Sequence, residues 1–485
     1  MAALPIAARR RVVALLTFCL VLLTPAWALA HGALKSSVPA ADAHLGVAPT
    51  LLRLTFTESP ELTFTTITLR APDGSAVALG ALQLVRDSRR VVVAAVQGAL
   101  LAGTYTVEWK TAGADGHPVT GRFDFTIAPG AQGLGVASAV PESGGRAPAL
   151  APMTHEDPTA LPSRDAGFDA ESLLYVVVRW LLYAGLLTVI GAVAFQFVVL
   201  GLLRRMRGPG SNVGLLIGNR AASVGLVGAA LVGVAVLLRL YAQSFAMHGA
   251  TQVLDRALVA AMLTTTTWGL GWLLQIVSVV VAIAGFWYAR RGGQAAWGLA
   301  AIGAVGLAFT PALSGHAASA PTLTALAILA DGLHVIGAGG WLGSLLVVVL
   351  IGIPAALRLE ESERGSGVAD LVSAFSPTAL AFAGLTATTG AFAAWLHLGA
   401  VSALWQTSYG RTLLLKLAIL SIVAATGAYN WRRIKPALGD ATNAVRLRRS
   451  ATTEVTVGVL VLVVTAVLVA MPTGIVQTAE MTIGQ

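Results

Sequence analysis

The chain has 485 residues, of which 56% are hydrophobic and 11% are charged. Soluble globular domains carry a charge on about a quarter of their residues, so this composition excludes a chain that is soluble throughout and indicates that most of it lies in a lipid bilayer. The formal net charge of +9 does not indicate nucleic-acid binding, because the arginines cluster between apolar runs, as they do in the cytoplasmic loops of membrane proteins.

The amino terminus has the three parts of a signal peptide in the right order. Basic residues precede a short apolar run, Val12–Leu23, and Ala28 and Ala30 supply the small residues that a signal peptidase reads. We therefore predict that residues 1–30 are cleaved, which makes His31 the first residue of the mature chain. The alternative is an uncleaved membrane anchor with His31 as a surface residue.

Residues 31–128 have the pattern of soluble β structure. Short β-rich runs are separated by turn sequences such as Ala71-Pro72-Asp73-Gly74. The runs are Leu51–Phe56, Thr63–Leu69, Arg90–Val96, Thr104–Trp109 and Arg122–Ile127. We expect an antiparallel β-sandwich of about seven strands, followed by a flexible linker, rich in Pro, Gly, Ala and Ser, over residues 129–170.

Residues 171–475 contain about eight apolar segments that are long enough to cross a membrane. We place them at Ser172–Leu203, Val213–Tyr241, Trp268–Ala289, Gln294–Leu313, Leu323–Leu350, Leu371–Leu398, Thr412–Trp431 and Thr453–Met471. If the sandwich is exported, every arginine-rich gap between segments faces the cytoplasm, as the positive-inside rule requires. The sequence therefore predicts a multi-pass protein of a bacterial cytoplasmic membrane, with its amino-terminal domain in the periplasm or extracytoplasmic space.

Three residues of the exported part form a candidate metal site. The α-amino group and imidazole of His31 offer one chelate, and Asp115 and His117 flank a glycine in a turn between two strand runs. Nitrogen and oxygen donors of this kind suit tetragonal Cu(II). The one cysteine, Cys19, lies in the predicted signal peptide, so no thiolate contributes. No methionine lies between His31 and Ala151, which argues against a Cu(I) site in the sandwich.

A second candidate metal site lies at the outer end of the membrane segments. Ionisable residues within a membrane are costly and usually face the interior of a bundle, so they are functional candidates. Under the predicted topology the outer end carries four histidines with an aspartate and a methionine nearby: His316, His334, His397, Asp331, His248 and Met247. We expect His316, His334 and His397 to converge on one position for Cu(I) or Cu(II). The alternative is hydrogen bonding at the membrane interface.

Three basic residues in the apolar segments need separate explanations. Arg179 and Arg239 lie near outer helix ends, where their side chains could snorkel to the headgroups. Lys416 lies about a turn deeper and could balance Asp331 or control a cation path by repulsion. The sequence leaves these roles open.

The residues described so far resemble two known families. His31-Gly32-Ala33-Leu34, Ser37-Val38-Pro39-Ala40, Phe56-Thr57-Glu58 and the segment Ala114–Gly121 resemble the periplasmic CopC copper-binding family. Gly315-His316-Ala317, Asp331–His334, Gly340–Gly343 and Tyr409–Lys416 resemble the CopD family. The resemblance implies a natural YcnJ-like fusion, with a cupredoxin-like or Ig-like sandwich that binds Cu(II) through His31, Asp115 and His117.

The function that follows is capture of Cu(II) outside the membrane and passage of copper to a membrane histidine site, for uptake, homeostasis or resistance. Copper, the lipid bilayer and other periplasmic copper carriers are the expected partners, and we expect no catalytic activity. No P-loop is present, so we expect no ATP drive. Three alternatives stay open: a haem-binding electron-transfer protein, a copper monooxygenase, and a copper sensor or storage scaffold.

Overall fold

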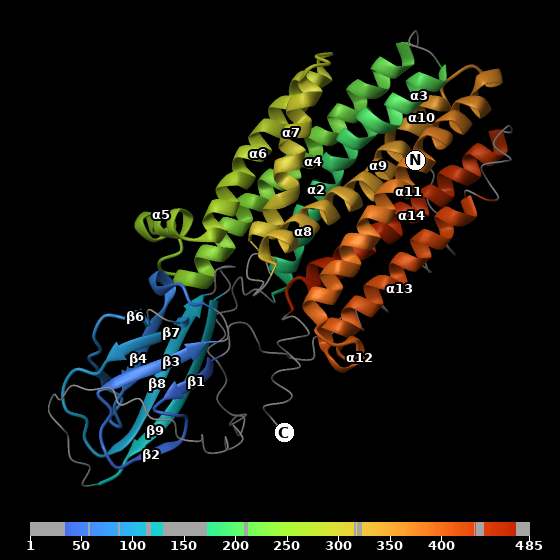
Figure 1. Cartoon of the computed structure of the whole chain (residues 1–485). Coiled ribbons are helices and arrows are strands. Elements are labelled where there is room, and N and C mark those ends of the chain that lie inside the picture. The colour runs from blue at the N-terminus through green and yellow to red at the C-terminus, as the bar shows by residue number, and fades with distance from the viewer. Residues whose placement is uncertain are drawn as a thin grey trace.

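The computed structural model describes residues 34–56, 59–85, 88–112, 118–129, 172–207, 212–314, 317, 323–430, 432 and 441–471. They form a β-sandwich followed by a helical bundle, and the sandwich lies at one end of the bundle (Figure 1). The predicted fold class, a sandwich followed by about eight membrane helices, is confirmed.

The sandwich consists of two sheets. One has the strand order β1-β3-β7-β6 and the other β2-β9-β8-β4-β5. The strands are β1 (Leu34–Val38), β2 (Ala43–Leu45), β3 (Leu51–Phe56), β4 (Thr66–Arg70), β5 (Ala76–Val77), β6 (Gln83–Val85), β7 (Ser88–Ala95), β8 (Gly103–Ala112) and β9 (Pro118–Ile127). All pairings are antiparallel except β2 with β9, which is parallel. The fully antiparallel expectation is wrong at this edge, because the short β2 joins the second sheet directly after β1 has joined the first.

Alternating side chains fill the space between the two sheets. Leu52, Leu54 and Phe56 of β3 are buried, as are Phe125 and Ile127 of β9. The residues between them along each strand point away from the core, which is the period of two that a strand imposes.

Eight helices or helical runs are long and apolar enough to cross a membrane in the described part of the chain. The chain is a multi-pass membrane protein. The helices are α2 (Leu173–Ala194), α3 (Leu200–Arg207), α4 (Asn212–His248), α5 (Arg256–Thr265), α6 (Thr267–Arg290), α7 (Ala296–Leu313), α8 (Thr324–Ala338), α9 (Ser344–Val347), α10 (Ile353–Ala356), α11 (Glu361–Leu398), α12 (Ala403–Gln406), α13 (Ser408–Tyr429) and α14 (Ala441–Leu468). Helix α5 has ten residues and is too short to span. It lies beside the sandwich in Figure 1, where the sequence predicted a loop.

The fifth span runs from Thr324 to Ala356 and contains two π-helical turns, Gly339–Gly343 (η3) and Val348–Gly352 (η4). Turns of this kind are rare within helices and are common at functional sites. At η3 the backbone of Gly343 approaches α2 so closely that an added Cβ would lie 1.9 Å from the Leu187 carbonyl oxygen. The facing residue of α2 is also a glycine, Gly191, so two backbones cross here without side chains between them.

Candidate functional site

The predicted Cu(II) ligands of the sandwich, His31, Asp115 and His117, lie outside the described residues. The strands beside them are described. Strand β1 starts at Leu34, which pairs with Phe56 at the end of β3, and Ala112 at the end of β8 pairs with Pro118. The Phe56 ring packs edge-on against Trp109 of β8, with 5.3 Å between ring centroids. The strand ends on either side of the predicted site therefore lie near one another in the two sheets.

The same end of the sandwich contacts the helical bundle. The ammonium group of Lys110 in β8 donates a hydrogen bond to the backbone carbonyl of Met247 in α4, with an N–O distance of 2.7 Å. The rings of Phe64 and His248 lie 6.1 Å apart between centroids, and Ala112 packs in the same apolar cluster as Met247. Burial at this contact lowers the pKa of Lys110 below its ordinary value. We call this set of five residues the docking contact.

His248 has one ring nitrogen free at the docking contact. The Ser244 hydroxyl donates to the Val253 carbonyl at 2.6 Å, so its oxygen accepts the proton of His248 Nδ1 at 3.2 Å. His248 Nε2 is then the unprotonated nitrogen, and it is buried with no hydrogen-bond partner in the part of the chain that the structure describes. A neutral imidazole whose second nitrogen is oriented by a hydrogen bond is the usual form of a histidine metal ligand.

A second polar group lies among α8, α11 and α13. Asp331 and His334 lie one helical turn apart on α8, and His334 Nδ1 is 3.2 Å from the Thr389 hydroxyl of α11. Lys416 on α13 is close enough to Asp331 and His334 to interact with both electrostatically. Asp331 interacts in the same way with Tyr409. Asp331 and Lys416 do not form a direct ion pair in the described part of the chain. We call Asp331, His334, Lys416 and Tyr409 the outer polar group.

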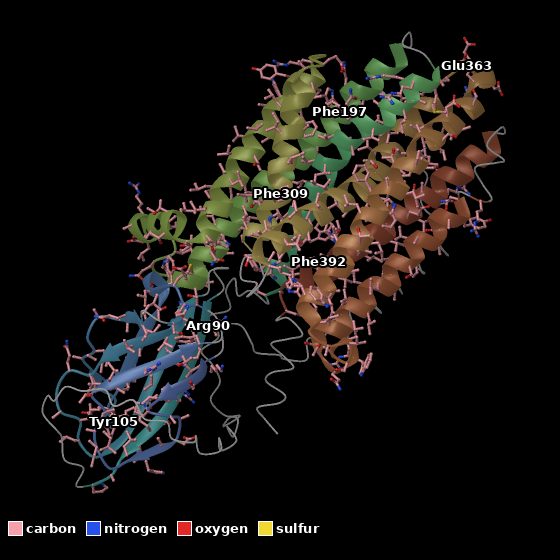
Figure 2. The ribbon with its side chains drawn as sticks, viewed as in Figure 1. Arg90, Tyr105, Phe197, Phe309, Glu363 and Phe392 are labelled. Carbon is pink, nitrogen blue, oxygen red and sulfur yellow. The ribbon has the colours of Figure 1, made fainter. Side chains whose placement is uncertain are left out.

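The Phe309 ring supports this group from α7. An added Cβ on Gly332 would lie 2.4 Å from that ring, so glycine lets the ring pack directly on the backbone of α8 between Asp331 and His334. Phe309 is labelled in Figure 2, in the middle of the bundle. The local sequence Asp331-Gly332-Leu333-His334 therefore combines two chemical groups with a close helix contact.

The predicted convergence of the membrane histidines is not found among the residues that the structure describes. These residues contain no group of three or more His, Cys, Asp or Glu side chains that could hold a metal ion. His334 contacts Thr389, which lies eight residues, about 12 Å along a helix, before His397. His248 lies at the docking contact instead, and His316 lies outside the described residues. Among the described residues, His248 and His334 therefore lie at separate positions, and the convergence of His316 with His334 and His397 stays a prediction.

The two buried arginines do not snorkel, so that interpretation is wrong. Arg239 is 7% exposed and donates to Gln275 Oε1 at 2.9 Å and to Ser314 Oγ at 3.1 Å. Arg179 is also buried, and its guanidinium lies 4.3 Å from the centre of the Tyr175 ring. Neighbouring helices supply partners that a single apolar segment does not reveal.

Sequence reasoning missed Lys110, Phe64 and Ala112 of the docking contact, and also Ser244, which contacts His248. Ser244 could have been found, because it lies four residues before His248 and therefore on the same face of a helix. Lys110 left no such signal, since 137 residues separate it from Met247.

A sandwich that contacts one end of a multi-pass bundle, with an imidazole open at the contact, defines a membrane protein with an attached extramembrane binding domain. Comparison with known protein families shows which family this chain belongs to. Residues 34–128 match the CopC domain, residues 169–325 match the Copper resistance protein D-like, N-terminal domain, and residues 369–468 match Copper resistance protein D. The chain belongs to the CopC and CopD family of copper resistance and copper transport proteins and carries both domains. The predicted resemblance is confirmed.

Three relatives indicate how the match is distributed. The Copper transport protein CutJ of Bacillus subtilis (strain 168) is 25% identical over 92% of this chain and 75% of its own length. The Copper resistance protein C of Escherichia coli is 35% identical over 24% of this chain and 94% of its own length. The Copper resistance protein D of Pseudomonas syringae pv. tomato is 27% identical over 60% of this chain and 94% of its own length. The chain is thus similar to a long copper transport protein as well as to the separate C and D proteins.

Proposed function

We propose that this protein captures Cu(II) in its periplasmic sandwich and passes copper into the membrane domain for uptake, homeostasis or resistance. His31, Asp115 and His117 are the proposed Cu(II) ligands of the sandwich. His248 is the proposed first residue of the membrane domain to receive copper. Asp331 and His334 are proposed to bind copper at the next position along the path. Copper is the cargo at both membrane positions.

The observation that carries this proposal is the unpartnered Nε2 of His248 at the docking contact. A buried nitrogen acceptor without a partner is costly, and a metal ion would supply the missing partner. Residues 113–117 connect Ala112 and Pro118, and Ala112 is part of the apolar cluster that includes Met247. The proposed donor ligands Asp115 and His117 therefore belong to a segment attached at the docking contact.

The charge of Lys110 opposes a metal ion at this position, because its field reaches His248. A cation on His248 and a protonated Lys110 repel each other in a partly desolvated contact. We propose that copper arrives at His248 as Lys110 withdraws from Met247, so that loading of the membrane domain and release of the sandwich are coupled.

Copper accumulation in cells tests the proposal. We compare wild type with His248→Ala, His334→Ala and the matched control His44→Ala, an exposed histidine of β2, and supply external Cu(I) or Cu(II). We expect His248→Ala and His334→Ala to reduce accumulation at least fivefold and His44→Ala to leave it unchanged. The purified His334→Ala protein should still bind Cu(II). If His248→Ala accumulates as much copper as His44→Ala, His248 is not on the path.

A further inference from the structure

A buried carboxyl group lies far from the docking contact, where α13 ends beside α14. Glu454 of α14 is 6% exposed, and Asn430, the C-cap of α13, is 8% exposed. The Asn430 side-chain amide donates a hydrogen bond to Glu454 Oε1. One turn before Asn430, Gly427 presents no side chain toward the carboxyl group, and an added Cβ there would lie 3.7 Å from Glu454 Oε2.

The pair lies inside the membrane span at its basic end. Glu454 is six residues into the span Arg448–Leu468, which is about 9 Å at 1.5 Å per residue. The charged start of α11 marks the same end of the bundle, and Glu363 is labelled there in Figure 2, away from the sandwich. By the positive-inside rule this end faces the cytoplasm.

Glu454 forms no ion pair with a described residue, and its side chain hydrogen-bonds to Asn430. The elements packed against α14 are α2, α9, η4, α11 and α13. Helix α9, η4 and the inner half of α2 carry no titratable residue. The titratable residues on the inner parts of α11 and α13 are Glu361, Glu363, Arg364, Asp370 and Tyr429, and Arg432 follows α13. On α14 itself, Arg448 and Arg449 are exposed and lie more than one turn before Glu454. An ionised carboxylate at this depth without a cation is costly.

The oxygen of the Asn430 side-chain amide indicates which hydrogen bond is missing. Asn430 Oδ1 is buried and has no hydrogen-bond partner among the described residues. An ionised carboxylate offers only acceptors, whereas a protonated one offers a single O–H donor. A proton on Glu454 would give Asn430 Oδ1 its donor while the amide still donates to Oε1, so each group would donate to the other.

We propose that Glu454 and Asn430 form a proton-binding site at the cytoplasmic end of the membrane domain. The proton is taken from the aqueous phase at that end, binds one carboxylate oxygen and is returned there on deprotonation. The site gives the bundle one exchangeable unit of charge, separate from the copper positions proposed above.

An apolar layer separates this site from the outer polar group. Lys416 and Asn430 are 14 residues apart on α13, about 21 Å and close to four full turns, so they lie on nearly the same face. Between them α13 and α14 pack through one apolar cluster: Ile419, Val423, Val457, Leu460, Val461 and Val464, with Trp341 and Leu342 of η3 against it. The proton site therefore exchanges with the cytoplasmic end and not with the outer polar group.

Infrared spectroscopy of the full-length protein in lipid nanodiscs, without copper, tests the proposal. At pH 7 exposed carboxyl groups are ionised, so a protonated buried carboxyl is seen as a C=O stretching band. We expect this band in wild type and in the matched control Glu361→Gln, an exposed glutamate of α11. It should disappear in Glu454→Gln.

The variant Asn430→Ala supplies a second readout if Glu454→Gln does not fold. Loss of the amide should shift the frequency of the band, because the carboxyl group loses its hydrogen-bond partner. Absence of the band in wild type at pH 7, or a band that is unchanged in both variants, would overturn the proposal. Because no copper is present, either result is independent of the proposed copper path.

Discussion

The amino-terminal and carboxy-terminal halves of the membrane domain differ in whether their buried charged side chains have direct polar partners. In the first half Arg239 is held by Gln275 and Ser314, and its guanidinium lies 5.7 Å from the centre of the buried Trp268 ring. In the second half Asp331 and Lys416 interact without a direct ion pair. A charge whose hydrogen bonds are satisfied by neighbouring helices stabilises the fold, whereas a charge with few direct partners is available to a cation or a proton.

Packing differs between the halves in the same direction. In the most apolar stretch of α6, 50% of the residues are buried within the bundle. In the corresponding stretch of α13, only 11% of the residues are buried. The sandwich docks on α4, in the well-packed half, while the outer polar group and the Glu454–Asn430 pair lie on the helices of the other half. The sandwich therefore docks on a span of the first half, whereas Lys416 lies on α13, the least buried of the eight spans in the described part of the chain.

The largest effect should come from removing the buried arginine. Arg239→Leu leaves the acceptors of Gln275 and Ser314 unpaired and should lower the free energy of unfolding by about 3 kcal/mol. Denaturant titration of the protein in detergent measures this change. Arg220→Leu, an exposed arginine of the same helix, is the control and should cost less than about 0.5 kcal/mol. Equal losses for both variants would contradict a structural role that is special to Arg239.

A smaller effect is expected at the docking contact. Lys110→Met should weaken docking by about 1 kcal/mol, the usual net value of one hydrogen bond. Pulsed electron spin resonance between labels at the exposed residues Ser75 and Thr251 should give a broader distance distribution for this variant than for wild type. Lys35→Met, an exposed lysine of β1, should give the wild-type distribution.

The same labels test the pH dependence of docking. Burial lowers the pKa of Lys110 in the docked state below its ordinary value of 10.5, so the docked state binds fewer protons than the undocked state. Docking should therefore strengthen as the pH rises through the alkaline range toward 10.5 and level off above it. Histidines are neutral throughout this range. A docked fraction that falls with rising pH, or that changes equally in Lys110→Met, would contradict the assignment.

The smallest change in stability is expected at the outer polar group. Asp331→Asn keeps the shape of the side chain and removes a charge that has no direct ion pair with Lys416, so the free energy of unfolding should change by less than about 1 kcal/mol. Copper accumulation should nevertheless fall as far as in His334→Ala. The double variant Asp331→Asn/Lys416→Met should recover any lost stability but not the copper accumulation. A loss of stability as large as that of Arg239→Leu would remove the distinction between the two halves.

Periodic features of the fold could be predicted from the sequence. Eight spans follow from apolar segments of sufficient length, and β3 was predicted at its observed bounds, Leu51–Phe56. Helix α5 was missed because ten residues are too few for a spanning segment and its sequence has no strong turn or strand signal. The parallel β2–β9 edge was missed because three residues carry too little pattern to fix a partner strand.

The candidate sites were predictable only as residue types. Histidines and Asp331 were identified because ionisable groups are rare in apolar segments. Their grouping was not predictable, because it depends on helix rotation and on partners that lie far away in the sequence. Arg239 and Gln275 are 36 residues apart, and Asn430 and Glu454 are 24 apart on different helices. A single segment does not distinguish a snorkelling arginine from one that a neighbouring helix binds.

The crossing of Gly191 and Gly343 limits how the membrane domain can rearrange. With backbone against backbone, the first and fifth spans have no side chains whose rotamers could absorb a sliding or rolling movement. Asp331 and His334 lie on the helical run that is fixed at this crossing, whereas Thr389 and Lys416 lie on α11 and α13. A cation that reaches His334 therefore lies between a fixed helical run on one side and the movable helices α11 and α13 on the other. Any change in its coordination would come from movement of α11 and α13.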